Sequence, residues 1–319
     1  MSGTTIPSRA FVAFAAALLP ALCACGDMFA QRDETLPVPS AKTLAEVAGS
    51  AALAGSWRTT IQVADVPVGA ERHVCQVIAL DNASPLWVNE VNAQLSRGVH
   101  HLIVDRLPPD APLTAAPFRC DPTGGADVTR LAIAQKPSSR ISLPNGAAYR
   151  LEAQQHILLQ LHYLNSTEAA LHVHAEVDLR EAPWSGIETP LEAHSIFTGT
   201  FAIELPPRQP GRAQIDAVIG SGADGVRREV FAMTSHMHRL GVRASIYRLD
   251  AAGEPFELLH RSNDWAEPPL STFNPVLALQ SREALRLVCE YLNPTDRTVR
   301  FGPEADAEMC MLWVHYYDL

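Results

Sequence analysis

The sequence predicts an all-β fold, a sandwich or a barrel, beyond its N-terminal segment. Short runs of alternating apolar and polar residues recur, at residues 74–78, 101–104, 157–162 and 171–177. Turn formers separate such runs, for example Pro-Asn-Gly at residues 144–146. Helical periodicity is scarce, and its best stretch, residues 44–53, is short and rich in alanine. Short, closely spaced strands separated by turn-forming residues are typical of a β-sandwich or a barrel.

The N-terminal segment has the features of a bacterial export signal. Arg9 precedes an apolar run over residues 11–22, which is too short to span a bilayer as a helix. The Leu-Cys-Ala-Cys sequence that follows resembles a lipobox, although Cys23 stands where a small residue is usual. We expect lipidation at Cys25; the alternative is an ordinary secreted protein cut nearby.

Changes in composition and in the strand pattern indicate where the domains of the chain begin and end. We expect a signal peptide at 1–24, a polar tether at 25–55, and two domains at 56–182 and 183–319, because an irregular stretch at 181–186 interrupts the strand pattern. The net charge is −10 and the mature part has no basic cluster. Nucleic acid is therefore not an expected partner.

Four cysteines remain once Cys23 and Cys25 are set aside. An even number in an exported chain favours disulfides, and three connectivities are possible. If each half folds separately, the natural pairs are Cys75–Cys120 and Cys289–Cys310. A four-cysteine zinc site would need close Cys-x-x-Cys pairs, which this sequence lacks.

A His-Met-His sequence is the simplest metal-binding pattern in the chain. On a strand, His236 and His238 point to the same face, so both imidazoles converge, while Met237 points toward the core. The spacing alone is weak evidence, because His172 and His174 share it.

The last strand adds a thioether to these imidazoles. By strand parity one face carries Met309, Met311, Trp313 and His315, and Cys310 points to the other face. These side chains can simply fill a core. Beside a histidine pair, however, Met309 would supply a soft ligand, which suits Cu(I) and poorly suits Zn, Mg or Ca.

A second histidine group begins at two adjacent residues. His100 and His101 would point to opposite faces of a regular strand, so joint binding requires a bulge or a strand end, and Gly98 favours such a departure. His162 is the candidate third ligand. Its alternative is a hydrogen-bonded core histidine.

Together these residues resemble a known family, the copper type II, ascorbate-dependent monooxygenases, over about residues 65–319. This group includes peptidylglycine α-hydroxylating monooxygenase and dopamine β-monooxygenase. The matching features are the His-His pair, the Gln-Leu-His-Tyr strand at 160–163, the His-x-His at 236–238, the Glu-Met-Cys segment at 308–310 and the positions of the four cysteines.

The resemblance implies two tandem jelly-roll-like β-sandwich domains that carry two copper ions across a solvent-filled cleft. His100, His101 and His162 would hold the copper that stores an electron, with Gln160 behind these ligands. His236, His238 and Met309 would form the catalytic copper site. Ascorbate or another small reductant would supply the electrons.

The sequence departs from the family at the substrate pocket. Peptide-hydroxylating members have an arginine at the position of Thr234, and asparagine and tyrosine where this chain has Met311 and Trp313. A peptide with a C-terminal glycine is therefore not expected. Thr234, Met311, Trp313 and His315 are expected to line a pocket for an apolar or aromatic ligand.

The expected function is hydroxylation of a C–H bond in a small organic substrate with O2 and a reductant. One alternative is a non-catalytic copper-binding or electron-transfer lipoprotein of the envelope, and another is a binding module that uses no metal. The chain is expected to be exported and attached to a bacterial membrane through its lipid only, facing the periplasm.

Overall fold

The computed structural model describes residues 55–121, 128–181 and 190–319. These residues form strands, turns and irregular segments without a helix, which confirms the predicted all-β fold. Accordingly, no helix within these ranges could span a membrane. The expected signal peptide, the lipidation site Cys25, nearly all of the tether and the expected domain boundary lie outside the described residues.

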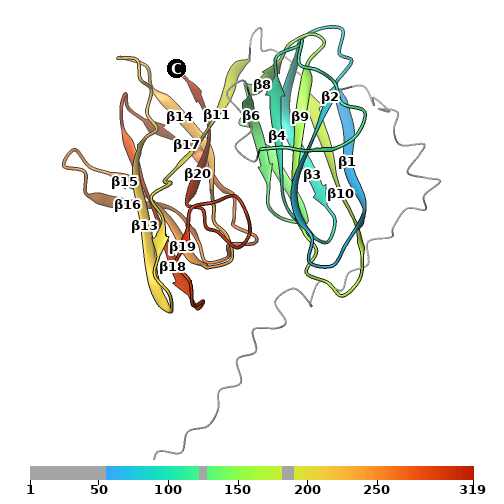
Figure 1. Cartoon of the computed structure of the whole chain (residues 1–319). Coiled ribbons are helices and arrows are strands. Elements are labelled where there is room, and N and C mark those ends of the chain that lie inside the picture. The colour runs from blue at the N-terminus through green and yellow to red at the C-terminus, as the bar shows by residue number, and fades with distance from the viewer. Residues whose placement is uncertain (1–54, 122–127, 182–189) are drawn as a thin grey trace, which may run out of the picture. The chain divides into compact units, whose positions relative to one another are not determined.

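One sheet of the first half of the chain, residues 55–181, carries the His100–His101 pair and His162. Most strands of this sheet are labelled in Figure 1. Its spatial order is β5 (Phe118–Arg119), β2 (Glu71–Ala79), β9 (His156–Leu164), β4 (Val99–Leu107) and β6 (Thr129–Ala134). The pairs β2–β9, β9–β4 and β4–β6 are all antiparallel.

A second, longer sheet contains strands from both halves of the chain. Its order is β1 (Ser56–Val66), β10 (Leu171–Glu181), β3 (Leu86–Leu95), β8 (Ala147–Leu151), β11 (Leu191–Gly199), β20 (Met311–Asp318), β14 (Arg228–His236) and β17 (Ser271–Leu279), with β7 (Ser138–Ser142) paired to β3. The two halves join where β8 and β11 pair in parallel.

Two further sheets belong to the second half. The larger has the order β13 (Gln209–Val218), β18 (Ala284–Asn293), β15 (Gly241–Leu249) and β16 (Pro255–Ser262). The smaller pairs β12 (Glu204–Leu205) with β19 (Val299–Arg300).

Two apolar cores hold the sheets together as β-sandwiches. In the first, side chains of the five-stranded sheet such as Leu102 and Leu159 pack with Val177 of β10 and Leu151 of β8. The second core combines Leu287 of β18 with Leu312 of β20 and neighbouring residues. Burial of inward-facing side chains from both layers is what stabilises a sandwich.

The strands that carry the candidate ligands are central and covered on both faces. β9 lies between β2 and β4, and β14 lies between β20 and β17. Nearly every residue of β9, β14 and β20 is buried. A side chain on such a strand has little freedom, so the fold provides rigid attachment points for a metal site.

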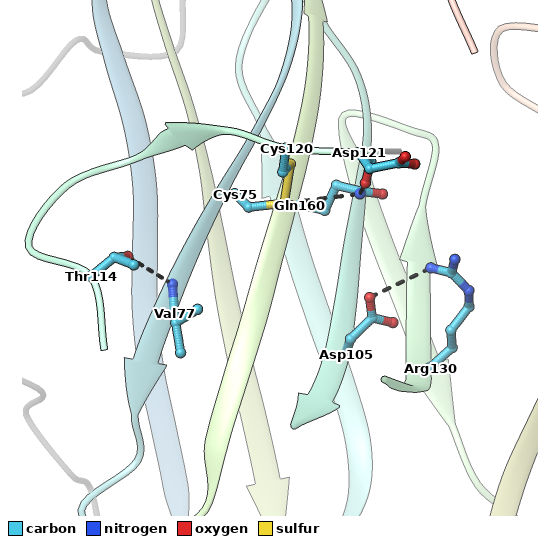
Figure 2. Close-up of a disulfide and its surroundings, with 8 residues drawn as sticks. All are labelled: Cys75, Val77, Asp105, Thr114, Cys120, Asp121, Arg130 and Gln160. Carbon is cyan, nitrogen blue, oxygen red and sulfur yellow. Dashed lines mark hydrogen bonds and ion pairs between the residues drawn. A yellow bond between two sulfur atoms is a disulfide. The ribbon is translucent and has the colours of Figure 1, made fainter. Parts of the chain in front are cut away.

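The described part of the chain contains two disulfides, Cys75–Cys120 and Cys289–Cys310. Of the three possible connectivities, this is the one in which each half is cross-linked separately. The first joins β2 to the segment after β5, beside Gln160 (Figure 2). The second joins β18 to the residue before β20.

Each disulfide is expected to stabilise the fold through the loop it closes. Replacing Cys75 and Cys120 by serine, 45 residues apart, should lower the free energy of unfolding by about 4 kcal/mol. The same change at Cys289 and Cys310, 21 residues apart, should lower it by about 3 kcal/mol. Urea unfolding under oxidising conditions measures both, and an unchanged midpoint in either double variant would contradict this role.

Candidate metal centre

His100 and His101 converge because β4 is irregular at this position. The pairing of β4 with β9 shifts register between Val99 and His101, as the sequence predicts for adjacent ligands. Gly98 precedes them with a φ of 86°, a left-handed conformation that favours glycine. As a result the two Nδ1 atoms lie 3.1 Å apart, although regular strand neighbours point to opposite faces.

His162 completes this first group from the neighbouring strand β9. It pairs directly with His101 across the sheet, and its Nδ1 lies 3.2 Å from Nδ1 of His100. Two imidazole nitrogens bound to one ion at about 2.0–2.1 Å lie roughly 2.8–3.4 Å apart for ordinary bond angles. Each of these two spacings fits a pair of ligands on one ion. The closer requirement for three ligands, that all nitrogens lie within 4.8 Å of one another, is met among the described residues by His73, His101 and His162 and by His100, His101 and His236.

A carboxylate fixes the tautomer of His162. Its Nε2 donates to Oε1 of Glu71 at 2.8 Å, because a carboxylate can only accept. Nδ1 is thereby left with its lone pair, directed toward the other two imidazoles. Histidine ligands of metals commonly donate their second nitrogen in this way.

His236 and His238 form a second pair, at the end of β14. The strand ends at His236, so His238 lies just beyond it rather than on it. Their rings are nevertheless 5.3 Å apart and nearly perpendicular. The chain is held in this turn by the Glu308 carboxylate, which accepts hydrogen bonds from the backbone N–H groups of His238 and Leu240.

In both imidazoles of this pair, Nε2 is bare: it carries no hydrogen and has no hydrogen-bond partner. Nδ1 of His236 donates to Oε1 of Gln135 at 2.6 Å, and Nδ1 of His238 donates to the carbonyl of Ala307 at 3.1 Å. Each Nε2 therefore carries a lone pair, and both atoms are buried without a hydrogen-bond partner. Buried acceptors without a partner are costly. A metal ion would satisfy both.

Met309 lines the same cavity as His236 but precedes the last strand. β20 begins at Met311, so the expected position of Met309 on that strand is wrong. The adjacent Cys310 is fixed by its disulfide, and the hydroxyl of Tyr291 donates to the carbonyl of Met309 at 2.7 Å. These two contacts hold the segment, and Met309 lines the same cavity as His101 and His236.

The two histidine groups are closer together than the expected solvent-filled cleft would allow. The ring of His236 lies 5.5 Å from that of His100 and 5.0 Å from that of His101, measured between centroids. Between residues 55 and 319, as far as the structure describes them, two groups of nitrogens could share an ion, and His100, His101 and His236 form one of them. Gln135, which follows β6, links the two halves of the chain at this point, because it accepts a hydrogen bond from His236 and donates one to the Ser235 carbonyl.

Sequence reasoning missed three residues of this centre. His73 stacks on His162 with centroids 3.8 Å apart, and with His101 and His162 it forms the other group able to share an ion. Glu71 and Gln135 hold ligand imidazoles. The available signal for Glu71 and His73 was their parity with Cys75 on one strand, because β2 pairs His73 with His162.

Other expected site residues lie elsewhere. The Gln160 amide donates to the carbonyl of Asp121 and lies next to the Cys75 sulfur, so its hydrogen bond does not go to an imidazole (Figure 2). The Thr234 hydroxyl donates to the Pro269 carbonyl. His315 is hydrogen-bonded to Tyr149 at 2.7 Å.

A cavity of about 430 Å³ opens beside the imidazoles. Met311 lines it as expected, but Thr234, Trp313 and His315 are not among its lining residues. Trp313 instead packs behind the wall, in a cluster with Ile103, Ile133 and Phe197. Most of the wall is apolar, and its lining residues include Ile103, Ile133, Phe197, Phe201 and Phe301.

Burial keeps the imidazoles of the centre neutral. It is the main cause that lowers the pKa of His100, His101, His162 and His236 well below 6.5, and neighbouring imidazoles lower it further. Burial also lowers the pKa of His238 and brings that of His73 to about 4. Neutral imidazole is the form that binds metals.

Residues 216–319 match the family model of the copper type II ascorbate-dependent monooxygenase C-terminal domain. The resemblance is confirmed for this segment. It contains His236, His238 and Met309, three of the residues that carried the resemblance. The family is copper- and ascorbate-dependent, and the donor set found here, imidazole with a nearby thioether, is compatible with copper. No curated protein matches the chain.

Solved structures with some likeness to the chain include viral coat proteins and a carbohydrate-binding module. A protein of Sulfolobus Turreted Icosahedral Virus is 5% identical, with a TM-score of 0.24 over 83% of this chain, which spans 56% of that protein. The major capsid protein of bacteriophage PM2 is 10% identical, with a TM-score of 0.33 over 82% of this chain and 98% of that one. A tandem module of Paenibacillus barcinonensis Xyn10C is 9% identical, with a TM-score of 0.20 over 82% and 86% of the two chains. Likenesses this weak carry no argument about fold or function.

Removing the hydrogen bond between Gln135 and His236 should weaken metal binding. Gln135→Leu removes the acceptor that orients His236, and affinity for the ion held by His236 and His238 should fall about 10- to 100-fold. Gln135→Glu keeps an acceptor for the Nδ1–H and should lose less. Competition titration with a Cu(I) chelator measures both variants, and equal affinity in wild type and Gln135→Leu would contradict the orienting role.

Burial of the Asp105 carboxyl should make the free energy of unfolding depend on pH. This carboxyl is fully buried, and burial raises its pKa from 3.8 to about 6 although Arg130 opposes the shift. The folded state therefore binds its proton more tightly than the unfolded chain, so the stabilisation is complete below about pH 4 and is lost by about pH 6. Relative to Asp105→Asn, wild type should lose about 2 kcal/mol of unfolding free energy between pH 4 and pH 7, as measured by urea unfolding. A pH-independent difference between the two proteins would contradict this.

Proposed function

We propose that this protein is a copper-dependent monooxygenase that hydroxylates a C–H bond of a small organic substrate. The observation that carries the proposal is the pair of imidazoles at His236 and His238, whose Nε2 atoms are buried, unpartnered and held by acceptors on Nδ1. They lie within the segment that matches the copper monooxygenase family. The overall reaction would consume one O2 and one ascorbate, giving the alcohol, dehydroascorbate and water.

Copper, when bound, would supply the one-electron chemistry and the activation of O2. His100, His101 and His162 would hold one ion through Nδ1, and His236, His238 and Met309 would hold the other. The tautomers leave the required nitrogen of two of these residues bare, because Glu71 occupies Nε2 of His162 while Gln135 occupies Nδ1 of His236. His73 is a further candidate ligand of the first ion, since its nitrogen lies within 4.8 Å of those of His101 and His162 while its ring stacks on that of His162.

The protein's own residues have three tasks in this reaction. Glu71, Gln135 and the Ala307 carbonyl keep the imidazoles in place. The apolar walls of the adjacent cavity limit the access of water and accept the apolar part of the substrate. The Cys289–Cys310 disulfide and Tyr291 keep Met309 in register with the histidines.

Export and attachment to the cell envelope belong to the same proposal. The apolar N-terminal run and the Leu-Cys-Ala-Cys sequence that ends at Cys25 support a lipid anchor on the periplasmic side. Disulfides support it too, because they persist in oxidising compartments.

A Met309→Ala variant separates a monooxygenase from a copper-binding or electron-transfer protein. If Met309 is a ligand at the reacting copper, hydroxylation should fall by at least about tenfold while the protein stays folded. Product formation, O2 uptake and ascorbate oxidation are measured together on a panel of small aromatic and aliphatic compounds. Met233→Leu is the matched control, because it changes a buried methionine of β14 that is not among the lining residues of the cavity, and it should keep product formation and O2 consumption coupled.

Two outcomes would count against the proposal. One is a copper-loaded wild type that forms no hydroxylated product with any compound of the panel. The other is a Met309→Ala variant that loses copper affinity but no reaction, which would favour the non-catalytic alternative.

A further inference from the structure

Three aromatic side chains, Trp313, His315 and Tyr317, form a row along one face of β20. They are alternate residues of the strand and therefore share a face with Met311, which lines the cavity. The rings of Trp313 and His315 lie 6.1 Å apart, measured between centroids. Both side chains are buried behind the cavity wall, and the proposed reaction gives neither of them a task.

A buried phenol is hydrogen-bonded to the imidazole of this aromatic row. The Tyr149 hydroxyl on β8 and Nδ1 of His315 are 2.7 Å apart, and Nε2 of His315 is buried with no hydrogen-bond partner among the described residues. If the phenol donates, only the Nε2–H stays unpaired. If the imidazole donates instead, both the phenol hydrogen and the Nε2 lone pair stay unpaired. Because unpaired buried polar groups are costly, the phenol is the donor.

His315 is therefore placed to accept the Tyr149 proton. Burial lowers the pKa of His315 to about 3, so the imidazole is neutral and its Nδ1 lone pair accepts the hydrogen bond. Burial also raises the pKa of Tyr149, so the phenol keeps its proton as long as it keeps its electrons. A phenol that loses an electron becomes a strong acid and would pass its proton along the existing hydrogen bond. The pair is thus able to hold a neutral tyrosyl radical.

Trp313 connects this pair to the cavity. It packs against three residues of the cavity wall, Ile103, Ile133 and Phe197. Its Nε1 is buried and has no hydrogen-bond acceptor within the part of the chain that the structure describes, so an oxidised indole would keep its proton. The Arg130 guanidinium, 5.8 Å from the indole ring, also disfavours positive charge there. An electron vacancy on Trp313 would therefore move on to Tyr149, where a proton acceptor stabilises it.

We propose that Trp313, His315 and Tyr149 form a protective electron-transfer route for the copper centre. This inference rests on the copper binding in the proposed function and adds a second activity, the reduction of peroxide when no substrate is bound. Peroxide takes up two electrons, and two protons from solvent, to become two water molecules. Cu(I) would supply one electron and Tyr149 the other, through Trp313, while the Tyr149 proton moves to Nδ1 of His315.

Ascorbate would restore the resting state. It returns one electron to the tyrosyl radical, and the proton on His315 moves back to the phenol oxygen, while a second electron reduces Cu(II). The far end of the aromatic row gives the reductant access, because Tyr317 is 9% exposed. The ring of Phe231 lies between the two, 5.9 Å from His315 and 6.5 Å from Tyr317.

The groups that this route protects line the cavity. Met309 and Met311 are both among the lining residues, and peroxide converts thioethers into sulfoxides. A sulfoxide at Met309 would remove the soft ligand of the second ion. Electrons delivered from Tyr149 would consume the oxidant before it reaches these side chains.

Electron paramagnetic resonance detects the radical directly. The full chain is loaded with Cu(I), mixed with stoichiometric hydrogen peroxide in the absence of substrate, and freeze-quenched. Wild type should give an organic radical whose hyperfine splitting collapses when the protein contains ring-deuterated tyrosine. The radical should disappear in Tyr149→Phe, and its yield should fall several-fold in Trp313→Phe.

Tyr316→Phe is the matched control. Tyr316 lies on the opposite face of β20, where its ring contacts Arg228 and His194, so this variant should keep the radical. Copper content and thermal melting are measured for every variant on the same samples. A copper-loaded wild type without a tyrosyl radical, a radical that persists in Tyr149→Phe, or an equal yield in Trp313→Phe would each overturn the proposal.

Oxidative damage tests the protective role. After repeated additions of peroxide, mass spectrometry should find several-fold more sulfoxide at Met309 and Met311 in Tyr149→Phe than in wild type. Equal sulfoxide content in the two proteins would also overturn the proposal.

The radical and the hydroxylated product are measured separately, so the two proposals fail separately. A Tyr149-dependent radical without hydroxylation of any compound keeps the protective route and rejects the monooxygenase. Hydroxylation without the radical rejects the route and leaves the monooxygenase intact. A protein that binds no copper rejects both.

Discussion

The hydrogen bond between Gln135 and His236 is the contact on which the candidate centre depends most. Gln135 follows β6 in the first half of the chain, and His236 ends β14 in the second. One amide accepts from the imidazole and donates to the Ser235 carbonyl, so it selects the tautomer and fixes the position of the ligand. The bare, buried Nε2 of His236 is a direct consequence.

Glu71 performs the corresponding task for the other set. Its carboxylate accepts from Nε2 of His162 and from the backbone N–H of Ala305, in the segment whose Ala307 carbonyl accepts from His238. Glu71 and Gln135, both in the first half of the chain, thus each orient one histidine ligand and also hydrogen-bond to a segment of the second half.

Much of the fold could be predicted from the sequence, because it is encoded locally. Alternation of apolar residues marks the strands, and the adjacency of His100 and His101 near Gly98 predicts the bulge that the register shift shows. The disulfides required one further assumption, that each half is cross-linked separately, and the structure satisfies it. The family resemblance then identified the histidines and Met309 as one set of candidates.

The supporting residues could not be predicted in the same way. Glu71 and His162 are 91 positions apart, and Gln135 and His236 are 101 apart, so no local pattern connects them. The close approach of the two histidine groups has the same origin, since it depends on contacts between halves and not on strand parity.

The central claim is that buried imidazoles with fixed tautomers bind copper in two sets. Copper analysis combined with electron paramagnetic resonance of the Cu(II)-loaded protein tests it most directly. The account predicts two copper ions per chain, with type II spectra and nitrogen hyperfine coupling that disappear on reduction with ascorbate. A stoichiometry of one or none, or spectra without nitrogen coupling, would contradict it.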